Sequence, residues 1–387
     1  MNSSRFFVPK LQDLILSEPR ALKELIEKAA SSPALFQAIS PLLTHHLLTL
    51  VVRGEKDAAE AMLQQASLFK DKTLLRALLS SEDTAASYSF GLDRNNPVKV
   101  RGTALQIALM ADDVDLYVDY RKTTNLCTGQ STVVPGPKVF DGIAEMILLY
   151  LKQLPDGEDL IAAQLRVDPT EEKQEKDRCE RDLEALEKVV KAIEASTDAE
   201  ARAALAHDAK EDNRAEAALI EFRNYLEPKE IITFGRKQFN PDLFLRALHL
   251  YNLKYKDFGN DHKSDKNRLF LRKIIGYIQR FLPACSGQVF AFGVLAVNKL
   301  GRDREKITRS LVFRCDSGAV FPLDSDPRYR LGYDFIVYSA AREDKLGLGV
   351  EERLHTACSE LFNEQKTAVQ RIVSEAQVVA ARPKSRV

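Results

Sequence analysis

The chain has 387 residues, of which 45% are apolar and 29% are charged, and its 56 basic side chains equal its 56 acidic ones. This balance is typical of a globular protein of two or three domains, and it excludes a largely disordered or fibrous chain. Because the formal net charge is zero, no overall attraction to nucleic acid or to an anionic membrane is expected. Only a local basic patch would bind an acidic partner.

The cysteines and the N-terminus predict neither a disulfide framework nor a cleaved leader. The five cysteines lie far apart and form no CxxC pair, which favours free thiols over disulfides or a zinc ribbon. Asp13 and Glu18 interrupt the apolar character of the N-terminus, so a cleaved signal peptide is not expected. The uncharged run at residues 281–298 predicts a buried core helix instead of a membrane span, with Cys285 as a structural thiol.

Helical spacing dominates the N-terminal part of the chain. Residues 11–39 predict a pair of short helices, punctuated by two prolines. Residues 47–63 predict two short antiparallel helices joined by a turn at Gly54. This second pair has the pattern of a degenerate ankyrin repeat.

A second unit of this kind begins at Thr103, whose hydroxyl can cap the helix that follows. Ala108 is expected to be buried in that helix, where two helices approach closely. The aspartates Asp112, Asp113 and Asp115 are expected at the start of the next helix, because the helix dipole favours negative charge there.

A polar stretch separates the two units. Residues 80–96 are rich in Ser, Asp, Gly and Asn, and we interpret them as an elaborated loop inserted into the repeat. Ankyrin-type stacks bind partners through their loops and concave face. Partner binding is therefore predicted at Asn95, Asn96, Lys99 and Arg101.

The middle of the chain is dense in charge. Residues 170–196 carry a heptad-like apolar seam at Leu183, Leu186, Val190 and Ile193. A capping box in residues 197–200 opens a second helix that is predicted to run to Tyr225. We interpret the two helices as a protruding, solvated hairpin that could be deleted without unfolding the remainder, with a partner-binding coiled coil as the alternative.

Further helices and one hairpin complete the prediction. Asn240 followed by Pro241 starts a helix that runs to residue 255, and another helix spans residues 269–280. Residues 310–321 predict a β-hairpin, and residues 346–380 predict a last helix before a basic tail.

The predicted fold class is mainly α, with ankyrin-like helical repeats, a helical domain and a small β-hairpin region near the C-terminus. The predicted regions are N-terminal helices (1–40), an ankyrin-like helical domain with a loop insert (41–167), a charged helical hairpin (168–226), a helical domain (227–300), a β-hairpin and turn-rich region (301–345) and a C-terminal helix with a tail (346–387).

Three blocks of sequence carry a family resemblance. They are residues 73–79 with 103–109, residues 239–251 with 275–284, and residues 309–314 with 321–327 and 330–334. In this order, over residues 43–335, they resemble a large group of ankyrin-like effector proteins delivered by the Dot/Icm type IV secretion system of intracellular bacteria. The chain departs from that pattern near Cys285, where similar proteins carry more aromatic residues. The resemblance brings no catalytic residues with it.

The sequence predicts no catalytic, cofactor-binding or metal-binding residue. The chain has no Walker A, GxGxxG, HExxH, GxSxG or EF-hand motif. Asp324 and Asp326 form a DxD pair that could hold a divalent metal in a transferase, or simply form turns before Pro327. The adjacent His45 and His46 would face different ways on a helix, which argues against a metal pair.

Together these observations predict a translocated bacterial effector that acts by protein–protein interaction in the host cell cytoplasm, without intrinsic catalysis or a cofactor. We expect a monomer with host protein partners, no nucleic acid and no membrane span. The basic clusters are interpreted as solvated faces, with contact to an acidic partner or to acidic lipids as the alternative. The resemblance implies a C-terminal export signal. The alternatives are a metal-dependent transferase with its site near Asp324 and Asp326, and a resident cytoplasmic scaffold of the bacterium.

Overall fold

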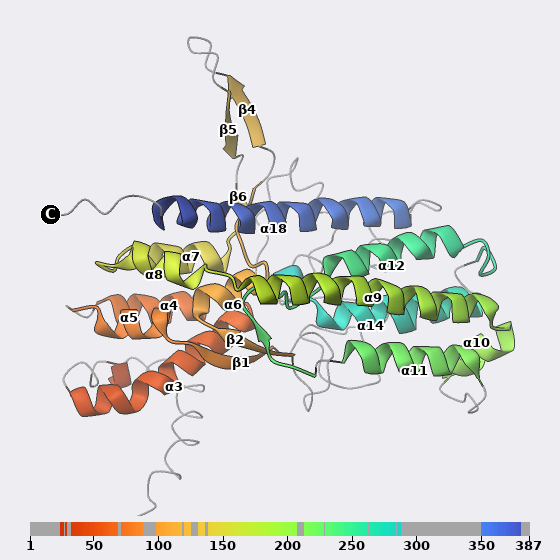
Figure 1. Cartoon of the computed structure of the whole chain (residues 1–387), viewed down its shortest axis with the longest axis horizontal. Coiled ribbons are helices and arrows are strands. Elements are labelled where there is room, and N and C mark those ends of the chain that lie inside the picture. Colours follow the sequence, from red (N-terminus) through yellow and green to blue (C-terminus); the bar gives the residue numbers. More distant parts are fainter. Residues whose placement is uncertain are drawn as a thin grey trace, which may run out of the picture.

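The computed structural model describes residues 24–26, 28, 32–68, 71–87, 98–117, 120–124, 131–135, 138–206, 213–227, 229–261, 264–283, 285–287 and 350–380. These residues are mostly helical, with one three-stranded sheet and two pairs of strands (Figure 1). The mainly α fold class is therefore confirmed. The predicted β-hairpin at residues 310–321 and the aspartates Asp324 and Asp326 lie outside the described residues.

The first described helices are α3 (Pro33–Val52), α4 (Lys56–Ser67) and α5 (Thr73–Ser80). The Ser32 hydroxyl caps α3 by accepting a hydrogen bond from the Leu35 backbone N–H. Gly54 turns the chain between α3 and α4 with φ of 69°, as predicted. The predicted end of a helix at residue 39 is wrong, because α3 continues through Pro41 and buries its apolar C-terminal half.

A small sheet flanks the predicted loop insert. Strands β1 (Asp83–Ser87) and β2 (Val98–Gly102) are antiparallel, and β7 (Ile232–Thr233) joins the other edge of β2 in parallel. Part of the predicted loop is thus a strand. In β2, which follows that loop, Val98 and Val100 alternate with Lys99 and Arg101, and this alternation is a sequence signal of a strand.

Helix α6 (Ala104–Met110) lies at the centre of the fold, and all seven of its residues are buried. Thr103 and Gln106 form a capping box at its start, which confirms the predicted cap. Asp112 follows with φ of 52°, and the next element is the short strand β3 (Leu116–Tyr117), not a helix. Because this unit is strand, helix, strand, it is no helix pair, and the ankyrin-like repeats are not confirmed.

The aspartates after α6 do lie at a helix N-terminus, but at that of α7 (Ile143–Leu151). The side chain of Asp113 accepts from the N–H of Ile143, at 2.9 Å, and that of Asp115 accepts from the N–H of Gly142, at 2.7 Å. A Cβ atom on Gly142 would overlap the backbone next to Asp115, so the close approach requires glycine. The aspartates were correctly predicted to lie at a helix N-terminus, but the predicted helix was wrong. Ile143, to which Asp113 bonds, lies 30 residues later in the chain.

Two further strand pairs precede α7 in the chain, and a helix follows it. Strand β6 (Lys138–Phe140) pairs antiparallel with β3, and β4 (Tyr120–Thr124) pairs antiparallel with β5 (Ser131–Pro135). Helix α8 (Gly157–Gln164) follows α7 after the predicted break at Pro155.

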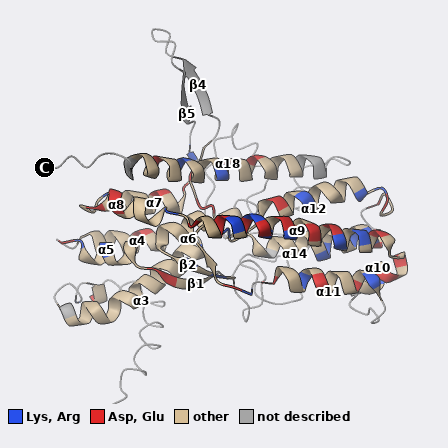
Figure 2. Ribbon diagram, in the orientation of Figure 1, with Lys and Arg blue, Asp and Glu red and all other residues tan. Residues whose placement is uncertain are grey.

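The charged region consists of α9 (Pro169–Ala195), α10 (Asp198–Ala206) and α11 (Arg214–Leu226). The predicted capping box forms between Thr197 and Glu200, but a new helix starts at Arg214, with the Asn213 side chain as its cap. Although α9 is rich in charge (Figure 2), it packs against α11, α12 and α13, and the seam residues Leu186, Val190 and Ile193 belong to the common core. The predicted protruding hairpin is therefore wrong.

The remaining helices are α12 (Pro241–Lys254), α13 (Asp265–Phe270), α14 (Gly276–Ile278) and α18 (Val350–Ala380), with a π turn at Leu271–Ile275 and a 3-10 turn at Gln279–Phe281. The Asn240 side chain caps α12, as predicted. Helix α18 runs across the molecule and packs against α8 at one end of the fold and α12 at the other (Figure 1).

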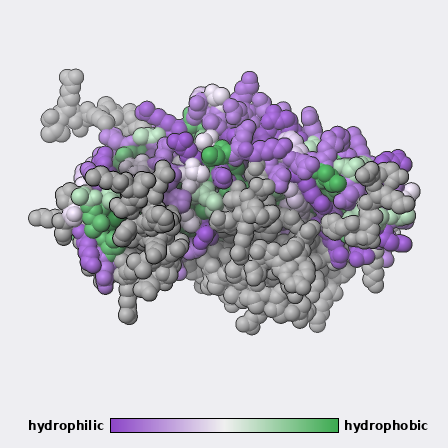
Figure 3. Space-filling view, turned by 90° about the horizontal axis from the view of Figure 1, so that it is seen from below, coloured by the Kyte–Doolittle hydropathy of each residue, from purple (hydrophilic) through white to green (hydrophobic). Residues whose placement is uncertain are grey.

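One segment in the described part of the chain, Ala34–Val52, is long and apolar enough to cross a membrane by composition, with a mean hydropathy of 1.5. It packs against α4, α5, α6 and β1, which is the environment of a core helix. On the face seen in Figure 3, hydrophobic residues form separate areas between hydrophilic ones.

The burial of α6 predicts the effect of a charge in its middle. Ala108 is 1% exposed, so Ala108→Glu would bury an unpaired carboxylate and should lower the free energy of unfolding by more than about 2 kcal/mol. Urea unfolding measures this change. Ala217→Glu, on the exposed side of α11, is the matched control and should unfold like the wild type. Equal stability of the two variants would contradict the central position of α6.

The packing of α9 to α11 predicts that they cannot be removed. Deleting residues 170–225 would expose the apolar sides of α12 and α13 that now pack on α9 and α10. The shortened protein should aggregate or bind a hydrophobic dye, as seen by size-exclusion chromatography and fluorescence. A monomeric remainder with a cooperative thermal transition would restore the interpretation of a protruding hairpin.

Candidate functional site

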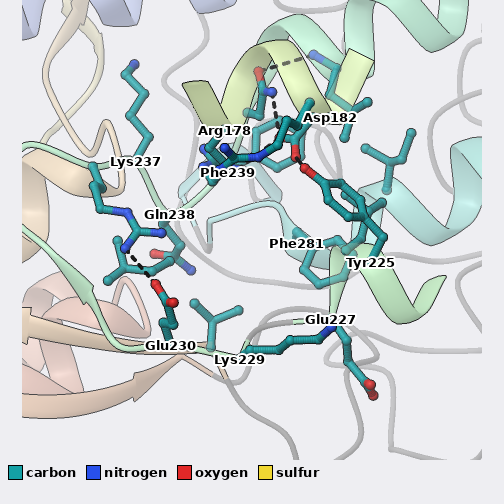
Figure 4. Close-up of a pocket in the computed structure, with 18 residues that line it drawn as sticks. Arg178, Asp182, Tyr225, Glu227, Lys229, Glu230, Lys237, Gln238, Phe239 and Phe281 are labelled. Atoms are coloured by element: carbon teal, nitrogen blue, oxygen red, sulfur yellow. Dashed lines mark hydrogen bonds and ion pairs between the residues drawn. The ribbon is translucent and has the colours of Figure 1, made fainter. Parts of the chain in front are cut away.

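A pocket of about 230 Å³ opens where α9, the end of α11, strand β7 and the start of α12 meet (Figure 4). Its apolar walls include Leu243, Ile278 and Phe281. Five basic and three acidic side chains also line it, so basic groups are in excess: Arg178, Arg181, Lys229, Arg236 and Lys237 against Asp182, Glu227 and Glu230.

The inner wall of the pocket is a polar network around Asp182, which is 2% exposed. Its carboxylate accepts from Arg178 at 3.0 Å, from the Asn240 side-chain amide at 2.8 Å and from the Tyr225 hydroxyl at 3.0 Å. Arg178 also makes a two-point contact with Glu175. Burial raises the pKa of Asp182, and the nearby Arg178 charge opposes that rise.

This network fixes the wall of the pocket in one arrangement. Burial and the Asp182 charge raise the pKa of Tyr225 to about 12, so the phenol keeps the proton that it donates. Figure 4 shows Tyr225 and Asp182 directed toward each other on one side of the pocket, across from Glu230 and Lys229. Because the buried groups bind one another, the groups available to a ligand are those at the rim.

Some of the basic side chains at the rim of the pocket form ion pairs with described residues, and others do not. Arg236 pairs with Glu230 at 3.2 Å, and Lys237 pairs with Asp112 at 3.0 Å. Arg181 and Lys229 are exposed and make no ion pair with any described residue. These two cations are the ones that a negatively charged partner meets first.

A groove between α9 and α11 adjoins the pocket and shares Arg181 and Tyr225 with it. It has a volume of about 270 Å³. Ala185 and Ala218 face it from the two helices, and the buried Val189 and Phe222 lie along it. The remaining lining residues are Glu184, Lys188 and Glu221.

The sequence-predicted binding residues fall next to this site but not inside it. Lys99 and Arg101 lie on the exposed face of β2, whereas Val98 of the same strand lines the pocket. Asn95 and Asn96 lie outside the described residues. Sequence reasoning missed Asp182 and Tyr225. The sequence did contain a signal for Asp182. This acidic residue lies four positions before Leu186, on the same side of the predicted helix, and Arg178 lies one turn before it.

Other groups considered from the sequence are buried or paired where they are described. Cys285 is buried, and its thiol contacts the Ala111 carbonyl at 3.0 Å, so the predicted burial of this cysteine is confirmed. His45 contacts Asp83 at 2.9 Å, and burial lowers the pKa of His46. No cluster of three or more His, Cys, Asp or Glu side chains suited to a metal occurs within the described ranges.

A second titratable cluster lies between β3, α7 and α18. Asp115 is buried and pairs with Lys138 at 2.6 Å, and it also accepts from the Tyr117 hydroxyl at 3.1 Å. Glu145 accepts from the Asp115 backbone N–H at 2.9 Å and lies 3.8 Å from Arg371. Burial, together with the charge of Asp115, raises the pKa of Glu145 to about 7.

Comparison with known proteins assigns no family. No family model matches the chain, and it matches no curated protein and no solved structure.

The raised pKa of Glu145 predicts a pH-dependent stability. Its pKa rises from 4.5 to about 7 in the folded state, so the folded protein binds this proton more tightly than the unfolded chain. Stability from this group is therefore present at low pH and falls by roughly 2–3 kcal/mol as the pH rises from about 5 to 8. Glu145→Gln should remove that part of the pH dependence and become more stable relative to the wild type at the higher pH.

Urea unfolding of both proteins across this pH range measures the difference. Glu158→Gln, at an exposed position of α8, is the control and should keep the wild-type dependence. A parallel shift of the wild-type and Glu145→Gln curves at every pH would contradict the assignment.

Proposed function

We propose that this protein is a translocated bacterial effector that acts as a monomer by binding a host protein, and that the pocket at the end of α11 receives an acidic segment of that partner. The observation that carries the proposal is the pair of exposed cations, Arg181 and Lys229, at the rim of a pocket with an excess of basic side chains. The sequence resemblance to ankyrin-like Dot/Icm effectors supports delivery into a host cell.

The chemistry of the rim favours an acidic protein segment over a nucleic acid. Two exposed acidic side chains, Glu227 and Glu230, line the pocket together with the cations, and they would repel a continuous phosphate backbone. A peptide carries its charges at separated points and can place one carboxylate beside Arg181 or Lys229 while it avoids the glutamates. Long-range attraction by the cations would mainly accelerate association.

The C-terminal helix supports the proposal of export. Glu360 and Glu364 lie on exposed positions of α18, at the end of the chain where the resemblance implies the address. Residues 381–387 of the predicted tail lie outside the described residues. Helix α18 can serve both roles, because its apolar side packs on the body while its polar side stays accessible.

Charge reversal at the rim tests the binding role. Arg181→Glu with Lys229→Glu should weaken binding of the host partner at least tenfold, because attraction at two points becomes repulsion. The partner is isolated by cross-linking to the full chain delivered into host cells. Its affinity for the purified variants is then measured at low and high salt, where wild-type binding should weaken as salt rises.

Lys173→Glu with Lys191→Glu is the matched control, since both lysines are exposed on α9 and line neither the pocket nor the groove. It should bind like the wild type. Equal loss in both double variants, or none in either, contradicts the assignment of the pocket. Failure of a reporter fusion to reach host cells would contradict the effector and favour a resident scaffold.

A further inference from the structure

The groove between α9 and α11 is built from residues that recur at helical spacing. On α9 these are Arg181, Ala185 and Val189, each four residues after the last, and on α11 they are Ala218, Phe222 and Tyr225. Alanine at positions 185 and 218 leaves space between the helices where larger side chains would fill it. The groove, with its volume of about 270 Å³, is therefore a consequence of two small residues that face it from the two helices.

The chemistry along the groove changes from one end to the other. The end shared with the pocket carries Arg181 and Tyr225. Farther along, the lining is Ala185, Ala218 and the apolar side chains Val189 and Phe222, which are 1% and 2% exposed. Lys188 on α9 and Glu221 on α11 form an ion pair with each other, so this part of the rim offers no uncompensated cation.

This gradient separates two recognition elements. An acidic group is attracted to the Arg181 end, because the cation there has no ionic partner among the described residues. The middle of the groove favours an apolar side chain, since the alanine, valine and phenylalanine side chains that line it offer no hydrogen-bonding group. The shared residues make the two sites continuous.

We propose that the partner segment carries, beside its acidic residue, one large apolar anchor residue that enters the groove between Ala185 and Ala218. This inference rests on the proposed function and adds a specificity element to it. Burial of a leucine-sized side chain in such a groove raises affinity by roughly 10- to 100-fold. The proposed partner motif is therefore an acidic residue and an aliphatic or aromatic residue at a fixed spacing.

Selection from a phage library of short random peptides on the immobilised full chain tests the motif. The wild type should enrich peptides with an acidic residue and a large apolar residue at constant spacing. Ala218→Leu fills the groove from α11 and should lose the enrichment of the apolar residue while keeping the acidic one. Ala185→Met fills the groove from α9 and should also lose the enrichment of the apolar residue. The test can therefore still be carried out if one of the two variants fails to fold.

Two controls make the result specific. Ala217→Leu adds the same side chain on the exposed side of α11 and should select the wild-type motif. Arg181→Glu with Lys229→Glu should lose the acidic residue from the selected peptides. An enriched peptide is then synthesised in its original form and with its apolar residue changed to alanine. The wild type should bind the alanine form at least tenfold more weakly than the original form. The Ala218→Leu variant should bind both forms with the same weak affinity.

The outcomes separate the two proposals. Enrichment of acidic peptides without an apolar position, or unchanged selection by both groove-filling variants, would overturn the anchor and leave the acidic site intact. Absence of any charge-dependent enrichment on the folded wild type would overturn the proposed function together with the anchor.

Discussion

The fold depends on the hydrogen bonds that satisfy the C-terminal end of α6. The carbonyl of Met110 accepts from the Gln238 N–H at 3.2 Å, and that of Ala111 accepts from the Cys285 thiol at 3.0 Å. The Asp112 carbonyl accepts from the Gln365 side chain at 3.3 Å. The last carbonyls of a helix have no partner within it, and a buried one costs free energy unless another group donates to it. Here three segments far apart in the sequence donate, so the end of α6 is a meeting point of the described part of the chain.

The other end of α6 is held in the same way. The Gln164 side chain contacts the Thr103 hydroxyl at 2.7 Å and donates to the Leu79 carbonyl at 3.0 Å, while the Gln164 carbonyl accepts from Gln106 at 2.7 Å. The ends of α5 and α8 therefore meet the start of α6. Because α6 is bound at both ends, the strand β2 that leads into it is fixed, and with it the position of Val98 at the edge of the pocket.

Local signals in the sequence predicted local structure well. The caps at Thr103, Thr197 and Asn240 depend on residues three or fewer positions apart, so they can be recognised without the fold. What failed depended on distant partners. Asp113 has its helix 30 residues away, and Asp182 meets Asn240 58 residues away. The many charged residues of α9 led to the prediction that this helix is exposed to solvent. That prediction failed because helical spacing alone does not show which polar residues a later segment covers.

The position of α18 has a mechanical consequence. It is the last described element, it lies along the outside of the fold, and Phe362 packs on Phe239 and Phe244 with ring centroids about 6 Å apart. No strand pairing ties it to the described body. Force applied from the C-terminal end would thus peel α18 away turn by turn, and withdrawal of Gln365 would leave the Asp112 carbonyl without this donor. Pulling β1 and β2 along their length in opposite directions would instead load all of their hydrogen bonds together, so a larger force is expected there than at α18.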